Sequence, residues 1–122
     1  MKLWIDDIRN APNDTWTVAK TVNSAISFIE RFGEEIIEIS LDHDISHQVA
    51  VGGLSRPYPC DETFQAVARY IVQYYRGKKR LPAIIVHTAN PVGAKVFQDI
   101  LKGWFHVEVH MMGVANRLEM EV

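Results

Sequence analysis

Short runs of consecutive apolar residues alternate along the chain with longer segments in which apolar residues recur every three or four positions. The short runs are typical of buried strands, and they lie at residues 2–6, 36–41 and 83–87. The helical spacing predicts amphipathic helices at residues 22–32 and 91–101. It predicts a third that is capped by Asp61 or Thr63 and runs to about Tyr75. Two further strands are expected at 15–21, which is rich in β-branched and aromatic residues, and at 105–111.

Strands alternate with helices after the second strand, which predicts right-handed crossovers between parallel strands. We therefore expect an α/β fold with a five-stranded parallel sheet in a three-layer arrangement. Neither an internal repeat nor a linker is visible in the sequence, so residues 1–122 are expected to form a single domain.

Capping residues flank two of the predicted helices. Asn23 or Thr21 can cap the start of the first, and Gly33 is placed to end it. Asn90, followed by Pro91, is suited to begin the last helix.

Residues 45–60 have no sustained periodicity and contain two adjacent glycines and two prolines. A loop of this length in a compact domain is usually functional or disordered. Because it directly follows a strand that ends in acidic residues, we expect a lid or a loop that holds substrate. His47 and Arg56 could then close over the substrate, and a flexible insertion is the alternative.

Composition narrows the class of protein. Apolar residues make up 48% and charged residues 23% of the chain, as in globular proteins with a hydrophobic core. The net charge of -2 argues against binding of nucleic acid through bulk electrostatics. A single cysteine, Cys60, fits a reducing compartment, and no signal peptide or membrane-spanning run is visible, so a cytoplasmic location is expected.

Acidic residues follow two of the predicted strands. Asp6 and Asp7 come after the first strand, and Asp42 and Asp44 come after the central one. Ligands of an open α/β sheet bind at the carboxyl ends of its strands, so these side chains should share one site. Buried carboxylates repel one another unless a cation neutralises them, and oxygen ligands favour Mg²⁺ or Mn²⁺. We expect three or four carboxylates to hold such a cation; a solvated acidic turn is the alternative.

Two histidines occupy similar positions. His43 lies between Asp42 and Asp44, and His87 ends the apolar run at 83–86. An imidazole titrates near neutral pH and could transfer a proton to a leaving oxygen. The alternative for each is a packed ring that hydrogen-bonds a neighbouring carboxylate. Asp44 could orient His43 or complete the metal shell.

Three further residues can hold an anion. Thr88 and Asn90 can orient a phosphate, and Asn90 also stands at a helix N-terminus, where free N–H groups bind anions. Arg9 can bind phosphate through two hydrogen bonds or pair with Asp7.

Several other chemistries are not indicated. No serine occupies a sharp strand-to-helix turn, so a Ser-His-Asp nucleophile is not supported. The sequence has no glycine-rich phosphate loop, and Cys60 has no CxxC partner that would suggest zinc.

The acidic pair Asp6-Asp7 after the first strand, Asp42 after the central strand and Thr88 after the next resemble the site of response-regulator receiver domains, which have a flavodoxin-like fold. Three departures from ordinary receivers stand out. The segment between the acidic pair and residue 15 is too short for the usual first helix, and the final helix is missing or very short. The receiver lysine has no counterpart at residues 110–113.

Three motifs together resemble the cyclic-phosphate-processing receiver domains, over about residues 3–101: Ile5-Asp6-Asp7-Ile8-Arg9, Ser40–Asp44 and His87–Pro91. The resemblance implies a metal-dependent phosphoesterase that acts on a cyclic phosphate, either a 2′,3′-cyclic RNA end or a cyclic nucleotide. In that interpretation the metal ligands are Asp6, Asp7 and Asp42, the catalytic residues are His43, His87 and Asp44, and the phosphate ligands are Arg9, Thr88 and Asn90.

Two other interpretations remain open. The chain could be a non-enzymatic receiver-like module, either a phosphoacceptor at Asp42 or a metal-dependent binder of a nucleotide or partner. The missing lysine argues against phospho-switching. The chain could also be a structural α/β domain whose acidic cluster is simply solvated.

Overall fold

The computed structural model describes residues 1–45 and 63–112. The loop at 45–60, with His47 and Arg56, therefore lies outside the described residues except for its first residue. The described strands are β1 Lys2–Ile5, β2 Trp16–Ala19, β3 Glu38–Leu41, β4 Ala83–Thr88 and β5 Val107–Met111. The described helices are α1 Val22–Phe32, η1 Gly33–Glu35, α3 Gln65–Tyr75 and α4 Pro91–Leu101.

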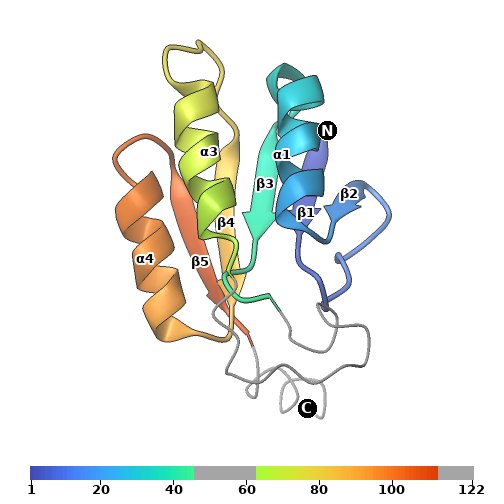
Figure 1. Cartoon of the computed structure of the whole chain (residues 1–122), viewed down its shortest axis with the longest axis vertical. Helices are drawn as coiled ribbons and strands as arrows, with labels where there is room; N and C mark the ends of the chain where they lie inside the picture. Colours follow the sequence, from blue (N-terminus) through green and yellow to red (C-terminus); the bar gives the residue numbers. More distant parts are fainter. Residues whose placement is uncertain (46–62, 113–122) are drawn as a thin grey trace.

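The strands form one sheet in the order β2-β1-β3-β4-β5, and every neighbouring pair is parallel (Figure 1). This arrangement confirms the expected five-stranded, receiver-like α/β fold. β1 lies between β2 and β3, so that Ile5 is level with Ala19 on one side and Leu41 on the other. The residues that follow β1 and β3 are consequently neighbours at the carboxyl edge of the sheet.

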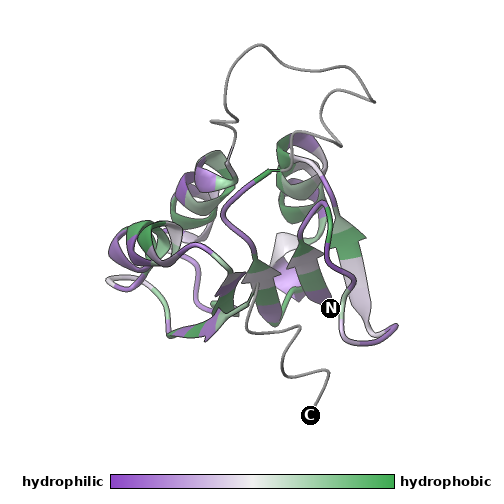
Figure 2. Cartoon of the chain, turned by 90° about the horizontal axis from the view of Figure 1, so that it is seen from below, coloured by the Kyte–Doolittle hydropathy of each residue, from purple (hydrophilic) through white to green (hydrophobic). Residues whose placement is uncertain are grey.

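All three α-helices lie on one face of the sheet (Figure 2). The chain passes from β2 to β3, β4 and β5 in one direction across the sheet, and right-handed crossovers in one direction place every helix on the same side. The other face would need a helix between β1 and β2, but that connection forms only short turns, as expected. The described residues thus form two layers, and the third layer expected from the alternation of elements is not among them.

Side-chain alternation divides each strand between the two faces of the sheet. Leu3 and Ile5 of β1, with Ile39 and Leu41 of β3, join the hydrophobic core under the helices. The intervening side chains point to the opposite face. They include Trp4, which is also buried and meets Trp16 of β2 edge-on at 5.6 Å between ring centroids.

The helix ends follow local sequence signals. The Thr21 side chain accepts a hydrogen bond from the backbone N–H of Ser24 and completes a capping box for α1. Asn90 accepts from Gly93 N at 3.0 Å, and Pro91 occupies the first turn of α4, as predicted. Gly33 follows the last residue of α1, but its φ of -52° keeps the chain helical, so that it begins the short 3₁₀ turn η1.

None of the helices in the described ranges has the length and apolar character needed to cross a membrane.

Candidate metal and phosphate site

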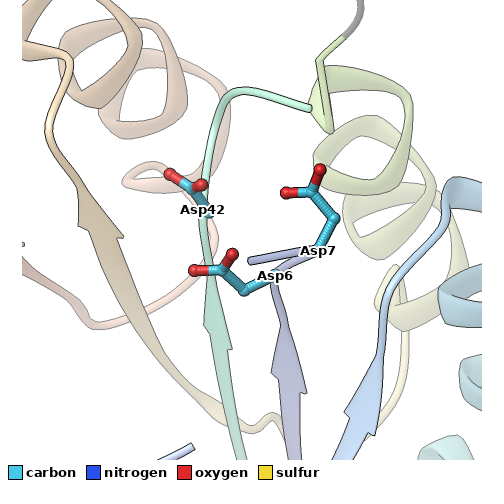
Figure 3. A group of neighbouring side chains, drawn as sticks. All are labelled: Asp6, Asp7 and Asp42. Carbon is cyan, nitrogen blue, oxygen red and sulfur yellow. The ribbon is translucent and has the colours of Figure 1, made fainter. Parts of the chain in front are cut away.

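Asp6, Asp7 and Asp42 come together at the carboxyl ends of β1 and β3 (Figure 3). The parallel ladder continues past the strands, because Asp42 N donates to the carbonyl of Ile5 at 2.9 Å. All three side chains are buried, and one oxygen from each lies within 4.8 Å of the others. Two ligands on opposite sides of a magnesium ion are about 4.2 Å apart, given Mg–O distances of roughly 2.1 Å. The donor set therefore fits a hard divalent cation with small adjustments.

Asp6 is held by partners on both carboxylate oxygens. Its Oδ1 accepts hydrogen bonds from the backbone N–H groups of Ile8 at 2.9 Å and Arg9 at 3.0 Å. Its Oδ2 lies 2.9 Å from Nε2 of His87. Burial alone would raise the pKa of Asp6, but these hydrogen bonds outweigh it and lower the pKa below its usual value.

The surroundings of Asp42 shift its pKa in the opposite direction from that of Asp6. Burial, followed by the nearby charge of Asp6, raises its pKa to about 7. The backbone N–H of His43, the guanidinium of Arg9 and the hydroxyl of Thr88 offset only part of this shift. Neighbouring carboxyl groups whose surroundings shift their pKa values in opposite directions are common in functional sites.

Arg9 supplies the positive charge at this edge of the sheet. Its NH1 lies 3.2 Å from Asp42 Oδ2 and 3.6 Å from Asp6 Oδ2, while 27% of its side chain is exposed. The carbonyl of Arg9 accepts from the indole Nε1 of Trp4 at 3.0 Å, which fixes its backbone. The sequence suggested either a phosphate ligand or an ion pair with Asp7, and the structure shows ion pairs that join Arg9 to Asp6 and Asp42.

His87 is brought to the acidic cluster, but from the helix-free face. Its ring is 1% exposed and stacks on Trp4 with 3.9 Å between ring centroids. Nε2 faces Asp6, and Nδ1 lies 2.7 Å from the hydroxyl of Ser40. Burial lowers the pKa of His87 in spite of the charge of Asp6. The structure thus gives His87 the contacts of a packed imidazole bonded to a carboxylate, and its catalytic role stays a prediction.

His43 points away from the three carboxylates. Its ring packs against Phe97 of α4, Nδ1 lies 2.7 Å from Asp44 Oδ1, and Nε2 lies 2.9 Å from Gln65 Nε2. A Cβ on Gly93 would lie 2.4 Å from Cγ of His43, so only glycine allows α4 to approach the ring this closely. His43 therefore links the end of β3 to both α3 and α4, and its catalytic role stays a prediction.

Asp44 lies at the rim of the site, with 54% of its side chain exposed. Besides His43, it contacts Nδ2 of Asn90, which is 3.4 Å from both carboxylate oxygens. The grouping of metal-binding side chains within the described residues includes Asp6, Asp7 and Asp42 but not Asp44. Three carboxylates converge rather than four, and Asp44 instead connects the end of β3 with the start of α4.

Thr88 and Asn90 lie at the end of β4, next to the cluster. The hydroxyl of Thr88 accepts from Asn90 N at 3.1 Å and is fully buried. Asn90 is half-buried and caps α4. Asn90 is therefore the more accessible of the two for an anion at the N-terminus of α4.

The sequence interpretation missed Ser40, Trp4, Gln65 and Gly93, which hold the two histidines. Strand alternation could have found Ser40, because Ser40 is level with Ile85, which shares a face of the sheet with His87. No comparable local signal connects Gln65 or Gly93 with His43, since they meet only after α3 and α4 pack.

A family model described as a cyclic-phosphate processing receiver domain matches residues 1–103. The chain belongs to this family. The matched range contains all of the carboxylates, histidines and phosphate-ligand candidates described above. In this cyclic-phosphate processing receiver domain, the acidic cluster is one that could hold a metal ion. Comparisons with curated proteins and with solved structures found no match to the chain.

Proposed function

We propose that this receiver domain is a metal-dependent phosphoesterase that opens a cyclic phosphate, either a cyclic nucleotide or a 2′,3′-cyclic RNA end. The observation that carries the proposal is the convergence of Asp6, Asp7 and Asp42 at the carboxyl ends of β1 and β3 with a guanidinium beside them. A cyclic phosphodiester is an anion, so it requires positive charge in a site otherwise lined by carboxylates.

The reaction adds water across one P–O bond. The water oxygen bonds to phosphorus, the bond to one ring oxygen breaks, and that oxygen takes up a proton, which gives a phosphomonoester and a hydroxyl group. A divalent cation on Asp6, Asp7 and Asp42 would polarise the phosphoryl group and lower the pKa of a bound water.

The remaining side chains would bind and orient the phosphate. Arg9 lies beside the carboxylates and can pair with a phosphate oxygen through its guanidinium. Asn90 and the N-terminus of α4 can hold a second oxygen, while Thr88 fixes the backbone of Asn90. Asp44, exposed at the rim and bonded to His43, is the proposed group for proton exchange with the leaving oxygen.

The partner in this proposal is a small cyclic phosphate or the end of an RNA, and the setting is the cytoplasm. The single cysteine of the chain supports a reducing compartment. Mg²⁺ or Mn²⁺ is the proposed cofactor, since both prefer oxygen ligands.

The test is turnover of 2′,3′-cyclic AMP and of a short RNA with a 2′,3′-cyclic phosphate end, followed by ³¹P NMR with Mg²⁺ or Mn²⁺. We expect hydrolysis that EDTA abolishes and that falls at least about 100-fold in Asp42→Asn, which removes a charged ligand. Asp99→Asn is the matched control, because Asp99 is an exposed carboxylate on α4 that pairs with Lys95. Turnover that persists in Asp42→Asn or in EDTA would contradict the proposal.

The competing function is a phosphoacceptor at Asp42. Incubation with acetyl phosphate and Mg²⁺ distinguishes the two functions. Stable labelling that Asp42→Asn abolishes, without turnover of any cyclic phosphate, would favour the phosphoacceptor.

A further inference from the structure

Three side chains from neighbouring strands form a continuous chain of hydrogen bonds beneath the acidic cluster. Ser40 Oγ of β3 lies 2.7 Å from Nδ1 of His87 on β4, and His87 Nε2 lies 2.9 Å from Oδ2 of Asp6, just past β1. The imidazole therefore spans β3 on the helix-free face of the sheet. All three residues are at most 1% exposed.

We infer that Ser40 and His87 position the Asp6 carboxylate for metal binding, which makes Ser40 a positioning residue of the site. This inference rests on the metal site of the proposed function. It differs from a Ser-His-Asp nucleophile, because the hydroxyl of Ser40 is buried and directed at His87, away from any substrate.

The partners of Asp6 assign the donor and acceptor roles in the chain. Oδ1 of Asp6 already accepts two backbone N–H groups, so the carboxylate acts as an acceptor throughout. His87 must then donate through Nε2–H, which leaves a lone pair on Nδ1 of the neutral ring. The Ser40 hydroxyl donates to that lone pair. The other tautomer would place a lone pair of Nε2 against Asp6 Oδ2 at 2.9 Å, which is repulsive.

Packing prevents the ring from turning out of this arrangement. Trp4 stacks on His87 with an interplanar angle of 10°, and the indole is itself fixed by its hydrogen bond to the carbonyl of Arg9. Oδ2 of Asp6 thus has a fixed direction, with further lone-pair capacity for a cation. Outer partners of this kind orient metal ligands, and losing one typically weakens metal affinity 10–100-fold.

Manganese affinity, measured by calorimetry on the folded chain of residues 1–122, tests the inference without any need for turnover. His87→Leu removes the donor to Asp6 and should weaken Mn²⁺ binding at least about tenfold. His87→Gln keeps a donor and an acceptor side by side, so it can bond both Asp6 and Ser40 and should stay within about threefold of wild type. Ser40→Ala should weaken binding about tenfold, since it removes the only donor to Nδ1 that the described contacts show.

Ile39→Val is the matched control for stability, because Ile39 precedes Ser40 on β3 but faces the hydrophobic core. It should destabilise the fold and leave Mn²⁺ affinity unchanged. Ring ¹⁵N chemical shifts give a second readout: we expect the Nε2–H tautomer of His87 in wild type and a shifted Nδ1 resonance in Ser40→Ala.

The outcomes distinguish failure of the positioning role from failure of the phosphoesterase proposal. Wild-type affinity in His87→Leu, equal weakening in His87→Gln and His87→Leu, or an Nδ1–H tautomer would overturn the positioning role. Absence of turnover with intact Mn²⁺ binding would overturn only the phosphoesterase proposal. Absence of Mn²⁺ binding by wild type would overturn both.

Discussion

At the scale of single residues, the ionised form of Asp42 is unfavourable in the folded protein. Burial and the charge of Asp6 raise its pKa to about 7, whereas an aspartate in the unfolded chain ionises near pH 4. Between these values the folded state binds more protons than the unfolded state. The contribution of Asp42 to stability is therefore full below pH 4 and is lost as the pH rises through 7.

We expect Asp42→Asn to stabilise the metal-free protein at pH 8 and to have little effect at pH 4. The shift in the pKa sets an upper bound on the order of 4 kcal/mol for the gain at pH 8. Urea unfolding of wild type and variant at both pH values measures the difference in the free energy of unfolding.

The comparison uses the difference in the free energy of unfolding between wild type and Asp42→Asn. His87 is present in both proteins, and it changes the free energy of unfolding with pH in the opposite direction from Asp42. Its pKa is lowered by burial, so its contribution increases as the pH rises toward 6.5. A gain from Asp42→Asn that is the same at pH 4 and pH 8 would show that Asp42 does not titrate in this way.

At the scale of elements, the first turn of α4 lies close against the ring of His43 because residue 93 is a glycine. Gly93 has no side chain where a Cβ would lie 2.4 Å from the ring, and its N–H is held by Asn90. In a helix interior, alanine is normally more stabilising than glycine by up to about 1 kcal/mol. At this position the collision with a buried ring reverses that preference.

We expect Gly93→Ala to lower the free energy of unfolding by about 1–3 kcal/mol. Gly103→Ala is the matched control, because a Cβ added there would have no neighbour within 4 Å and the backbone of Gly103 does not have positive φ. That variant should be neutral or slightly stabilising. Thermal unfolding followed by circular dichroism compares the two. Equal stability of both variants would contradict the close contact between α4 and His43.

The sequence predicted the elements well and their packing less well. Parallel strands, the Thr21 and Asn90 caps and the convergence of Asp6, Asp7 and Asp42 follow from local patterns and from the geometry of parallel sheets. The five-stranded receiver-like sheet is confirmed, but alternation of strands and helices does not specify the strand order or which face of the sheet each helix covers. Because β1 lies between β2 and β3, the chain passes from β2 to β3, β4 and β5 in one direction, and the connection from β1 to β2 runs the opposite way.

The two histidines show a second limit of prediction from the sequence. Strand-end position indicated that His43 and His87 belong near the acids, and both do contact a carboxylate. Which face of the sheet each ring occupies depends on alternation within β3 and β4, and the partners of His43 come from two helices that are distant in sequence. The sequence pattern shows that a histidine is present at the end of a strand, but the packing of the folded chain determines the direction of its imidazole.

At the scale of the whole molecule, a cation in this site would tie together two parts of the sheet. Asp6 and Asp7 follow β1, whereas Asp42 follows β3. A ligand that binds only the folded state stabilises it by about 2.7 kcal/mol at a concentration 100 times its dissociation constant.

We therefore expect saturating Mn²⁺ to raise the melting temperature by several degrees, as is typical of such a gain in a domain of this size. Differential scanning fluorimetry at increasing Mn²⁺ measures the shift. Asp7→Asn should remove most of it, and Asp14→Asn, which changes an exposed aspartate of the β1–β2 connection, should retain it. An equal shift in both variants would place the binding elsewhere.

The position of β1 also has a consequence for biosynthesis. β1 leaves the ribosome before β2 and β3, yet it lies between them in the sheet. Until Leu41 has emerged, the apolar residues Leu3, Trp4 and Ile5 of the nascent chain have no complete set of strand partners. Translation that stalls before β3 is complete would therefore release a fragment with an exposed apolar strand, the kind of segment that aggregates or recruits chaperones.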